Sequence, residues 1–404
     1  MEGQTWKTWR NIFNPGFASA HLMTLTPVIV KETLILCDVL RSFDRCGQVF
    51  QMKRLTDPWT MDIIGKVVLD TQLNTQTSEN TMVNALKRQM RWLPFLGQLN
   101  PWERWHPFRP LVHWCNARTM NEYLYPELDR QIATFRAQSS EPTKSIVRLA
   151  LQTYLAQDDS PKDVDETFKT FAISQIKQFL FSGYDTTSST VCYMFYLLST
   201  HPAVLDRVRD EHDRTLGSSL DQKVQKLKEE PYVLNQLPYS LAVCKETLRL
   251  FPTASTLRAG EPGFQVQDGQ GRLLPTEGFM VWGISQHLHR DKTYWDQPDV
   301  FRPDRWLVGP EDPRYPVKGA WRPFEFGPRN CIGQELALID MKIAMVLVLS
   351  MFDIAIAYTE IDRQKPRRPN NVNGERAYQA TVGAPSGGLP CRIKVRETKA
   401  EGLI

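Results

Sequence analysis

The segment PFEFGPRNCIGQELA, residues 323–337, decides the fold of this 404-residue chain. Gly327 and Gly333 permit tight backbone geometry on either side of Cys331, and Phe324 offers an apolar shield for the thiol. A helix is expected to begin just after Cys331, so its free N–H groups would point back toward the sulfur. We expect this helix to stabilise a thiolate and to lower the pKa of Cys331. The segment therefore suits a buried thiolate that ligates iron close to a flat cofactor.

A lone cysteine is more often a buried structural residue, so the surrounding residues must decide. Phe324, Gly327, Arg329, Cys331 and Gly333 match the pattern F-x-x-G-x-R-x-C-x-G in full. This pattern resembles the signature of the cytochrome P450 family. The resemblance implies a mainly α-helical fold with small β-sheets, and haem b with Cys331 as the axial ligand of its iron. It also implies that Arg329 faces a haem propionate as a charge-assisted donor.

Composition excludes few functions. Lysine and arginine number 49 against 45 aspartate and glutamate, a near balance that predicts no nucleic-acid partner. The seven cysteines are an odd number, widely spread and without a C-x-x-C pair, which indicates reduced thiols in a reducing compartment. The most apolar stretch, residues 343–352, is far shorter than the roughly 20 residues of a spanning helix. We therefore expect no membrane-spanning segment in this sequence.

The chain shows no internal repeat, so we expect a single domain over residues 1–404. The pattern of residues 1–260 is mostly helical, and Pro202 is typical of the first turn of one such helix. Residues 253–320 contain short apolar runs broken by glycine, proline and aspartate, which predict small strands and an irregular meander. Residues 378–395 predict two strands around the turn GAPSGG.

The segment SGYDTT, residues 182–187, predicts a polar site within a helix. Thr186 can donate to the carbonyl of Ser182 four residues back, and Gly183 leaves room beside it. The segment resembles the family's oxygen-binding motif, A/G-G-x-D/E-T-T/S, and this implies that Asp185 and Thr186 relay protons. Ser182 departs from the usual alanine or glycine, and its hydroxyl would crowd or hydrate the oxygen site. The alternative is a helix with small polar residues on a buried face.

Two further segments resemble structural motifs of the family. Glu246 and Arg249 in ETLR lie three residues apart, so they face the same side of a helix. FRPDRW, residues 301–306, resembles the family's F-x-P-x-R-F/W meander and supplies Arg305. The resemblance implies a buried triad of Glu246, Arg249 and Arg305 beneath the loop that contains Cys331, here called the cysteine loop. Taken alone, ETLR is more often an ordinary solvated ion pair.

Three residues elsewhere are expected to hold haem propionates. Trp6 and Arg10 resemble the family's W-x-x-x-R motif, and their side chains are suitable donors. Arg258 lies where the family often places another propionate ligand. The residues expected to line the substrate pocket are Phe179, Thr253 to Leu257, and Gly383 to Gly388.

The resemblance implies a monooxygenase that inserts one oxygen atom of O2 into a lipophilic organic substrate. The sequence has no flavin or nicotinamide fingerprint, so electrons are expected from a separate NADPH-cytochrome P450 reductase. The sequence as a whole resembles fungal P450 enzymes of secondary metabolism. The alternatives are a haem-thiolate isomerase or dehydratase, which would not need Asp185 and Thr186, and a non-catalytic fragment.

Family members carry a membrane anchor, several helices and most of a sheet before the Trp6 helix. We therefore expect this sequence to be the C-terminal portion of an enzyme on the cytosolic face of the endoplasmic reticulum, or a gene product with a misplaced start. The aromatic segment 91–108 would suit peripheral membrane contact or a core patch. Lys365, Arg367 and Arg368 would suit either an acidic reductase or a solvated loop.

Overall fold

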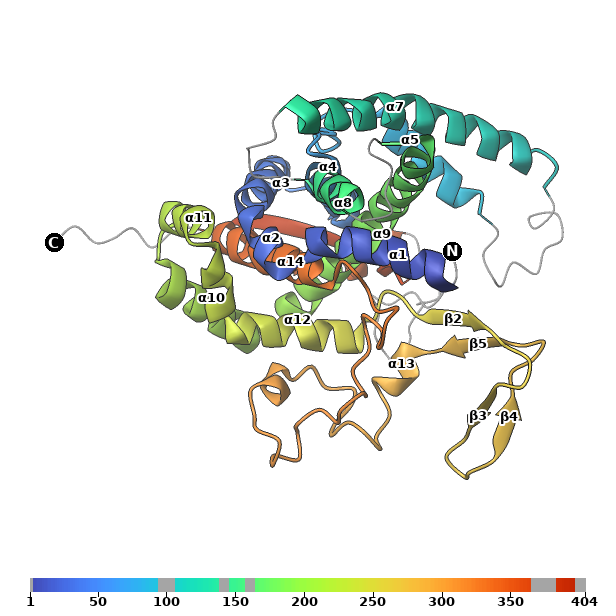
Figure 1. The fold of residues 1–404 in the computed structure, drawn as a ribbon. Coiled ribbons are helices and arrows are strands. Elements are labelled where there is room, and N and C mark those ends of the chain that lie inside the picture. The colour runs from blue at the N-terminus through green and yellow to red at the C-terminus, as the bar shows by residue number, and fades with distance from the viewer. Residues whose placement is uncertain (1–2, 94–105, 138–144, 157–163, 365–382, 397–404) are drawn as a thin grey trace.

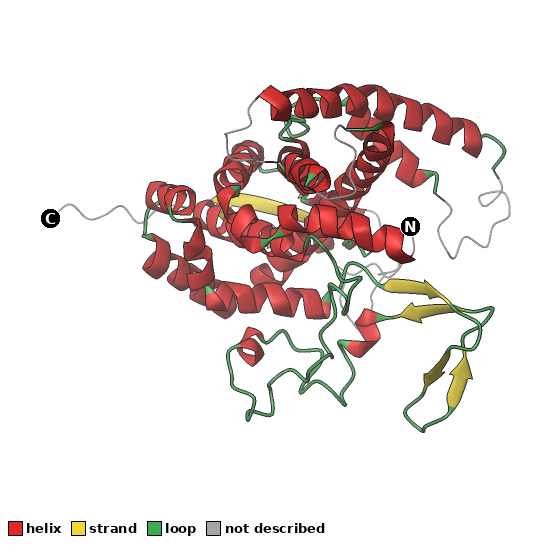
Figure 2. Cartoon of the chain, viewed as in Figure 1, coloured by secondary structure: helices red, strands yellow, loops and turns green. Residues whose placement is uncertain are grey.

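The structure is a computed structural model, and it describes residues 3–93, 106–137, 145–156, 164–364 and 383–396. The described chain is mainly α-helical with small antiparallel sheets, as the sequence predicted (Figure 2). Its α-helices are α1 (Gly3–Phe13), α2 (Ser19–Thr24), α3 (Thr26–Cys46), α4 (Lys53–Leu69), α5 (Thr81–Arg91), α7 (Arg109–Ala137), α8 (Ile146–Leu155), α9 (Glu166–Thr200), α10 (Pro202–Leu216), α11 (Leu220–Glu229), α12 (Pro238–Leu250), α13 (Ser285–Leu288), α14 (Gln334–Met351) and α15 (Tyr358–Gln364).

The short elements join and flank these helices. The 3-10 turns are η1 (Asn14–Phe17), η2 (Pro231–Gln236), η3 (Pro303–Trp306) and η4 (Ser386–Gly388). The strands are β1 (Phe50–Gln51), β2 (Thr256–Ala259), β3 (Gln265–Gln267), β4 (Leu273–Pro275), β5 (Met280–Gly283), β6 (Phe352–Ile356) and β7 (Pro390–Val395).

Local sequence signals fix the ends of the helices. The side chain of Asp165 accepts from the backbone N–H of Phe168 at 2.8 Å and so begins α9. Pro202 stands in the first turn of α10, and Gly217 with a φ of 101° follows its last residue. The helix expected after Cys331 is α14, which starts at Gln334 and ends at Met351.

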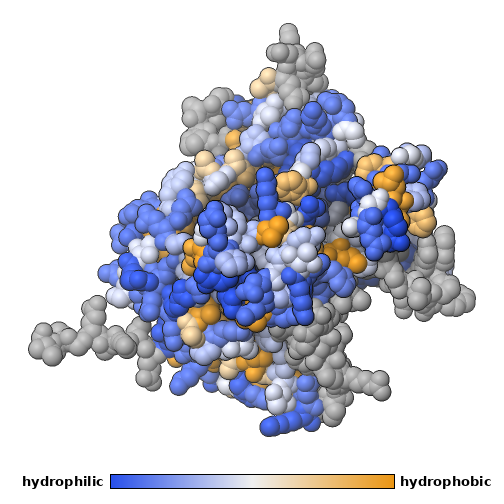
Figure 3. Space-filling view, turned by 90° about the horizontal axis from the view of Figure 1, so that it is seen from below, coloured by the Kyte–Doolittle hydropathy of each residue, from blue (hydrophilic) through white to orange (hydrophobic). Residues whose placement is uncertain are grey.

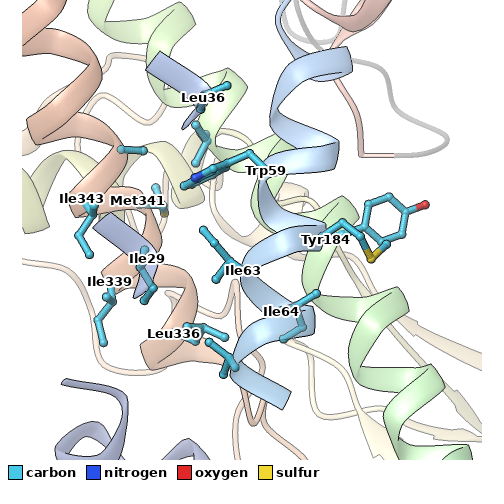
Figure 4. Packing of buried hydrophobic residues seen from close by; sticks show 14 of the residues in the cluster. Ile29, Leu36, Trp59, Ile63, Ile64, Tyr184, Leu336, Ile339, Met341 and Ile343 are labelled. Carbon is cyan, nitrogen blue, oxygen red and sulfur yellow. The ribbon is translucent and has the colours of Figure 1, made fainter. Parts of the chain in front are cut away.

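The core lies where α3, α4, α9 and α14 meet (Figure 4). Ile29 of α3, Ile63 of α4 and Met341 of α14 are fully or almost fully buried and point toward one another. Gly183 lets α9 approach α4, because a Cβ there would lie only 2.9 Å from Cγ1 of Ile64. Trp59 fills the same interior and donates its indole N–H to Thr33 Oγ1 at 3.1 Å. This packing fixes α9 and α14 at the centre of the helical body (Figure 1).

The sheets are small and antiparallel. One has the strand order β1-β7-β6, with Ile354 opposite Ile393 and Phe50 opposite Cys391. The other two are the pairs β2–β5 and β3–β4, which project from the helical body (Figure 1). These four strands confirm the small strands expected after residue 253. Of the two strands expected within residues 378–395, β7 is present, whereas residues 378–382 lie outside the described residues.

Apolar side chains remain exposed on the two projecting hairpins. Phe279, Trp282 and Leu273 are each more than half exposed. Figure 3 shows apolar patches among the polar side chains on the face seen from below. The helical body thus buries its apolar residues more completely than the hairpins do. No helix within the described ranges is both long and apolar enough to cross a membrane.

Candidate functional site

A cavity of about 280 Å³ lies between α9 and the loop that precedes α14. From α9 it is lined by Phe179, Gly183 and Thr186, and from the loop by Phe324 and Cys331. The connection between α12 and β2 supplies residues 253–256 to the same wall. The cavity is therefore lined by three segments that lie far apart in the sequence.

The loop before α14 turns Cys331 toward this cavity. The backbone N–H of Cys331 donates to the carbonyl of Phe324 at 2.8 Å, which closes the loop. Gly327 within it has a φ of 85°, a left-handed conformation that favours glycine. Gly333 also lines the cavity, and a Cβ there would meet nothing nearer than Phe17 at 4.0 Å. The loop thus places the thiol of Cys331 and the glycine at position 333, which has no side chain, in the wall of the same cavity.

The pKa of Cys331 differs from the expectation. Burial of the thiol raises its pKa, and this outweighs a hydrogen bond from the backbone of Gly333 and the charge of Arg10, which both lower it. The start of α14 thus lowers the pKa through Gly333, as expected, but the expected net lowering is wrong because the pKa of Cys331 is raised overall. Desolvation of this sulfur therefore disfavours its thiolate form in the polypeptide.

Helix α1 brings its two expected donors beside the cysteine loop. The guanidinium of Arg329 lies over the ring of Trp6, 4.2 Å from its centroid. Nη2 of Arg10 donates to Oδ1 of Asn330 at 3.0 Å. Arg329 lines the cavity. Two sequence motifs more than 300 residues apart thus meet at one edge of the site.

Arg258 stands apart from this group. It is exposed on β2, and its guanidinium donates to the carbonyl of Leu257 at 3.0 Å. It is two residues beyond Thr256, which lines the cavity, so it lies on the same face of the strand. Arg258 is nevertheless not part of the cavity wall.

The two polar residues of α9 face different ways. Oγ1 of Thr186 donates to the carbonyl of Ser182 at 2.8 Å, as predicted, and Thr186 lines the cavity. Asp185 is not in the cavity wall, because its carboxylate pairs with Nζ of Lys53 on α4 at 2.7 Å. Lys53 was missed by the sequence analysis, since 132 residues separate it from Asp185.

The expected triad is formed and is fully buried. Arg249 donates to Glu246 through Nε at 2.9 Å and Nη2 at 2.8 Å, and Arg305 donates through Nε at 3.0 Å. The indole of Trp306 also donates to this carboxylate at 3.0 Å. All three triad side chains are 0% exposed. The interpretation of ETLR as a solvated surface pair is therefore wrong.

His289 connects the triad to the cysteine loop. Its Nδ1 lies 3.2 Å from the carbonyl of Arg249, and its Nε2 accepts from the backbone N–H of Arg322 at 2.8 Å. A carbonyl can only accept, so Nδ1 carries the proton and the ring is neutral. Burial and the charge of Arg249 lower the pKa of His289 to about 3. The role of His289 is not predictable from the sequence, because an isolated histidine has no spacing pattern.

The expected pocket residues are met in part. Phe179 and residues 253–256 line the cavity, whereas Leu257 and Gly383 to Gly388 are not among its lining residues. Gly383 instead packs on Thr253, whose carbonyl oxygen would lie 2.2 Å from an added Cβ.

Asp340 of α14 also lines the cavity, although it was not predicted to do so. Burial raises the pKa of its carboxyl group well above the usual value. Of the aromatic segment 91–108, expected at a membrane surface or in a core patch, residues 94–105 lie outside the described residues. Lys365, Arg367 and Arg368, expected at a reductase or in a solvated loop, lie outside them as well.

The donor set fits haem. The thiol of Cys331 lines the cavity beside Gly333, which has no side chain of its own, and the cationic Arg329 lines the same space. Thr186 and Gly183 face this space from α9. A soft sulfur ligand combined with cationic donors suits an iron porphyrin with carboxylate substituents.

Comparison with known proteins decides the family. The family described as Cytochrome P450 matches residues 1–382. The chain belongs to the cytochrome P450 family. It is 40% identical over 406 residues to the cytochrome P450 monooxygenase polC of Polytolypa hystricis, across 99% of this chain and 73% of that protein. It is 30% identical to the cytochrome P450 monooxygenase acrF of Aspergillus aculeatus, across 97% of this chain and 83% of that protein.

A solved P450 structure has the same fold. The crystal structure of the cytochrome P450DA heme domain aligns with a TM-score of 0.74 at 21% identity, across 96% of this chain and 76% of that one. This P450 is thus an oxidoreductase of the monooxygenase class with haem b as its cofactor. As a member of the family it uses O2, an organic substrate and a redox partner.

We predict that Glu246→Gln lowers the free energy of unfolding by about 3–5 kcal/mol, because it leaves two buried guanidinium groups with no carboxylate. Urea denaturation followed by circular dichroism measures this change. Glu122→Gln is the control, since the Arg118–Glu122 pair is 65% and 62% exposed and should contribute little to stability. Equal effects of the two substitutions would contradict the assignment of a buried triad.

We predict that protonation of His289 destabilises the fold in acid. The pKa of this ring is about 3 in the folded chain and 6.5 when exposed, so the unfolded state binds its proton first as the pH falls. Stability should therefore decrease from pH 6.5 toward pH 3, by up to about 1.4 kcal/mol per pH unit for this group. His289→Gln should reduce that slope in urea denaturation at a series of pH values. A slope unchanged by the substitution would show that His289 does not titrate in this way.

Proposed function

We propose that this P450 inserts one oxygen atom of O2 into a lipophilic organic substrate. The observation that supports this most is that Cys331 and Thr186 line one cavity from opposite segments, so that a ligand sulfur and a proton-bearing hydroxyl face the same space. Phe179, Phe324 and Ile332 make much of the remaining wall apolar, which suits a substrate that partitions out of water.

Cys331 is the proposed axial ligand of the haem iron. The proposed partners of the propionates are Arg329, Arg10, Trp6 and Arg258, and Phe324 and Gly333 would flank the ring. When haem is bound, an axial thiolate donates electron density to the iron and favours cleavage of the O–O bond. The triad of Glu246, Arg249 and Arg305 is proposed to be structural, since it holds the meander and, through His289, the cysteine loop.

The chain's own polar residues are proposed to deliver protons. The hydroxyl of Thr186 lies at the cavity wall and is oriented by its bond to the Ser182 carbonyl. Asp185 is the preceding residue of α9 and forms an ion pair with Lys53 of α4. A carboxyl there can pass a proton inward and regain one from solvent, because it is about one-third exposed.

The proposed pathway, redox partner and cellular location are inferred from similar proteins. Two fungal monooxygenases are similar over nearly the whole chain, which supports a role in secondary metabolism. Human cytochrome P450 3A7 is 29% identical over 371 residues. We infer that electrons come from an NADPH-cytochrome P450 reductase and that the enzyme acts at the cytosolic face of the endoplasmic reticulum. We also propose that residues 1–404 form one domain.

The carbon monoxide spectrum tests the ligand. The haem-loaded, reduced chain should show the red-shifted band of a thiolate ligand, and Cys331→Ala should abolish it because the sulfur is removed. Cys115→Ala is the control, because Cys115 is exposed on α7 away from the cavity. A parent chain without the band, or a Cys331→Ala variant that keeps it, would contradict the proposed function.

Thr186→Ala should uncouple oxygen consumption from product formation. Loss of the hydroxyl should lower the product formed per NADPH roughly tenfold or more, since a positioned proton donor contributes at least that much. Thr134→Ala is a matched control, because its hydroxyl makes the same bond to a carbonyl four residues back on the exposed side of α7. Unchanged coupling in Thr186→Ala would remove Thr186 from the relay.

A further inference from the structure

One ammonium group serves two carboxylates between α4 and α9. Nζ of Lys53 lies 2.6 Å from Oδ1 of Asp57, one turn further along α4, and 2.7 Å from Oδ1 of Asp185 on α9. The lysine side chain is only 14% exposed. Burial disfavours its charged form, but the two carboxylates outweigh burial and raise the pKa of Lys53. The ammonium is therefore a charge that needs protein partners.

The two carboxylates are held unequally. Oδ1 of Asp57 also accepts from Oγ of Ser188 at 2.6 Å. Ser188 is fully buried on α9, and its hydroxyl lies 2.7 Å from Oγ1 of Thr56. Among the residues that the structure describes, Asp185 contacts Lys53 and has no second hydrogen-bonding partner. Asp57 is thus fixed at two points, whereas Asp185 is attached at one.

This difference sets the cost of releasing Asp185. A buried ammonium that loses its only carboxylate is left uncompensated, which is strongly unfavourable. Here Lys53 keeps Asp57 when Asp185 turns away, so the lysine retains a charged partner within hydrogen-bonding distance. We propose that Asp57 is a positioning residue that retains Lys53 and so makes the Lys53–Asp185 contact releasable.

The consequence for the reaction rests on the proposed function. Asp185 precedes Thr186, whose side chain lines the cavity, so release of Lys53 frees the carboxyl to turn toward that hydroxyl. The released carboxylate of Asp185 takes a proton from solvent and passes it inward through the Thr186 hydroxyl. Asp185 is then a carboxylate again, and in that form it pairs with the Lys53 ammonium as in the structure. Asp57 acts in this sequence only through Lys53.

A mutant cycle on the haem-loaded chain tests the electrostatic part without any turnover. The Lys53–Asp185 coupling is obtained from urea unfolding of the parent, Lys53→Met, Asp185→Asn and the double variant, and then again with Asp57→Asn in all four. We expect the coupling, expressed in the unfolding equilibrium constant, to grow about fivefold when Asp57→Asn removes the competing carboxylate. Equal or smaller coupling would mean that the two ion pairs are independent, and it would overturn the proposal.

The same helix offers a matched control. Lys66 and Asp70 have the same four-residue spacing in α4, at 2.5 Å. Asp70→Asn also removes one carboxylate from a lysine, but it should leave the Lys53–Asp185 coupling unchanged. A change as large as that of Asp57→Asn would assign the effect to the net charge of the helix and overturn the proposal.

Measurements of catalytic turnover provide a second, independent test of the role of Asp57. Asp57→Asn should lower the product formed per NADPH roughly threefold and increase the solvent isotope effect, whereas it should add nothing in the Asp185→Asn background. An equal effect in both backgrounds would show that Asp57 does not act through Asp185. The carbon monoxide spectrum of the same preparation separates the two claims. A missing thiolate band overturns the proposed function, while a normal band with unaltered coupling overturns the role of Asp57 alone.

Discussion

A single buried carboxylate, that of Glu246, holds the part of the chain that positions the site. It compensates two guanidinium groups in an interior that water does not reach. Arg249 then donates to the carbonyls of His289, Pro298 and Val300, and these bonds tie the irregular meander to α12. His289 continues the connection to the backbone of the cysteine loop. A long segment with little regular structure is thereby fixed from one end of a helix.

Helix α9 carries the other half of the site and faces two environments within one turn. Thr186 faces the cavity, whereas Asp185 and Ser188 face α4 and its lysine. The close approach of α4 depends on Gly183, since a side chain there would collide with Ile64. The same glycine therefore brings the ion pairs of Lys53 within reach of the helix that lines the cavity.

Sequence reasoning predicted the parts of the site that are encoded locally. The cysteine loop, the triad and the hydroxyl of Thr186 each follow from residues that are close in sequence or matched to a family motif. It could not predict that burial raises the pKa of Cys331, because desolvation depends on residues throughout the fold. It also missed Lys53, whose contact with Asp185 spans 132 residues and has no spacing rule. Strand β6 was not predicted from the sequence, because its partner β7 lies more than 30 residues further along the chain.

The proposed function requires iron in the cavity between α9 and the loop before α14, bonded to Cys331. Anomalous diffraction at the iron absorption edge, from crystals of the haem-loaded chain, tests this most directly. We predict one strong iron peak inside this cavity, with Sγ of Cys331 as its nearest protein atom. An iron peak elsewhere, or one in the cavity without the cysteine sulfur beside it, would show that Cys331 is not the ligand of the iron.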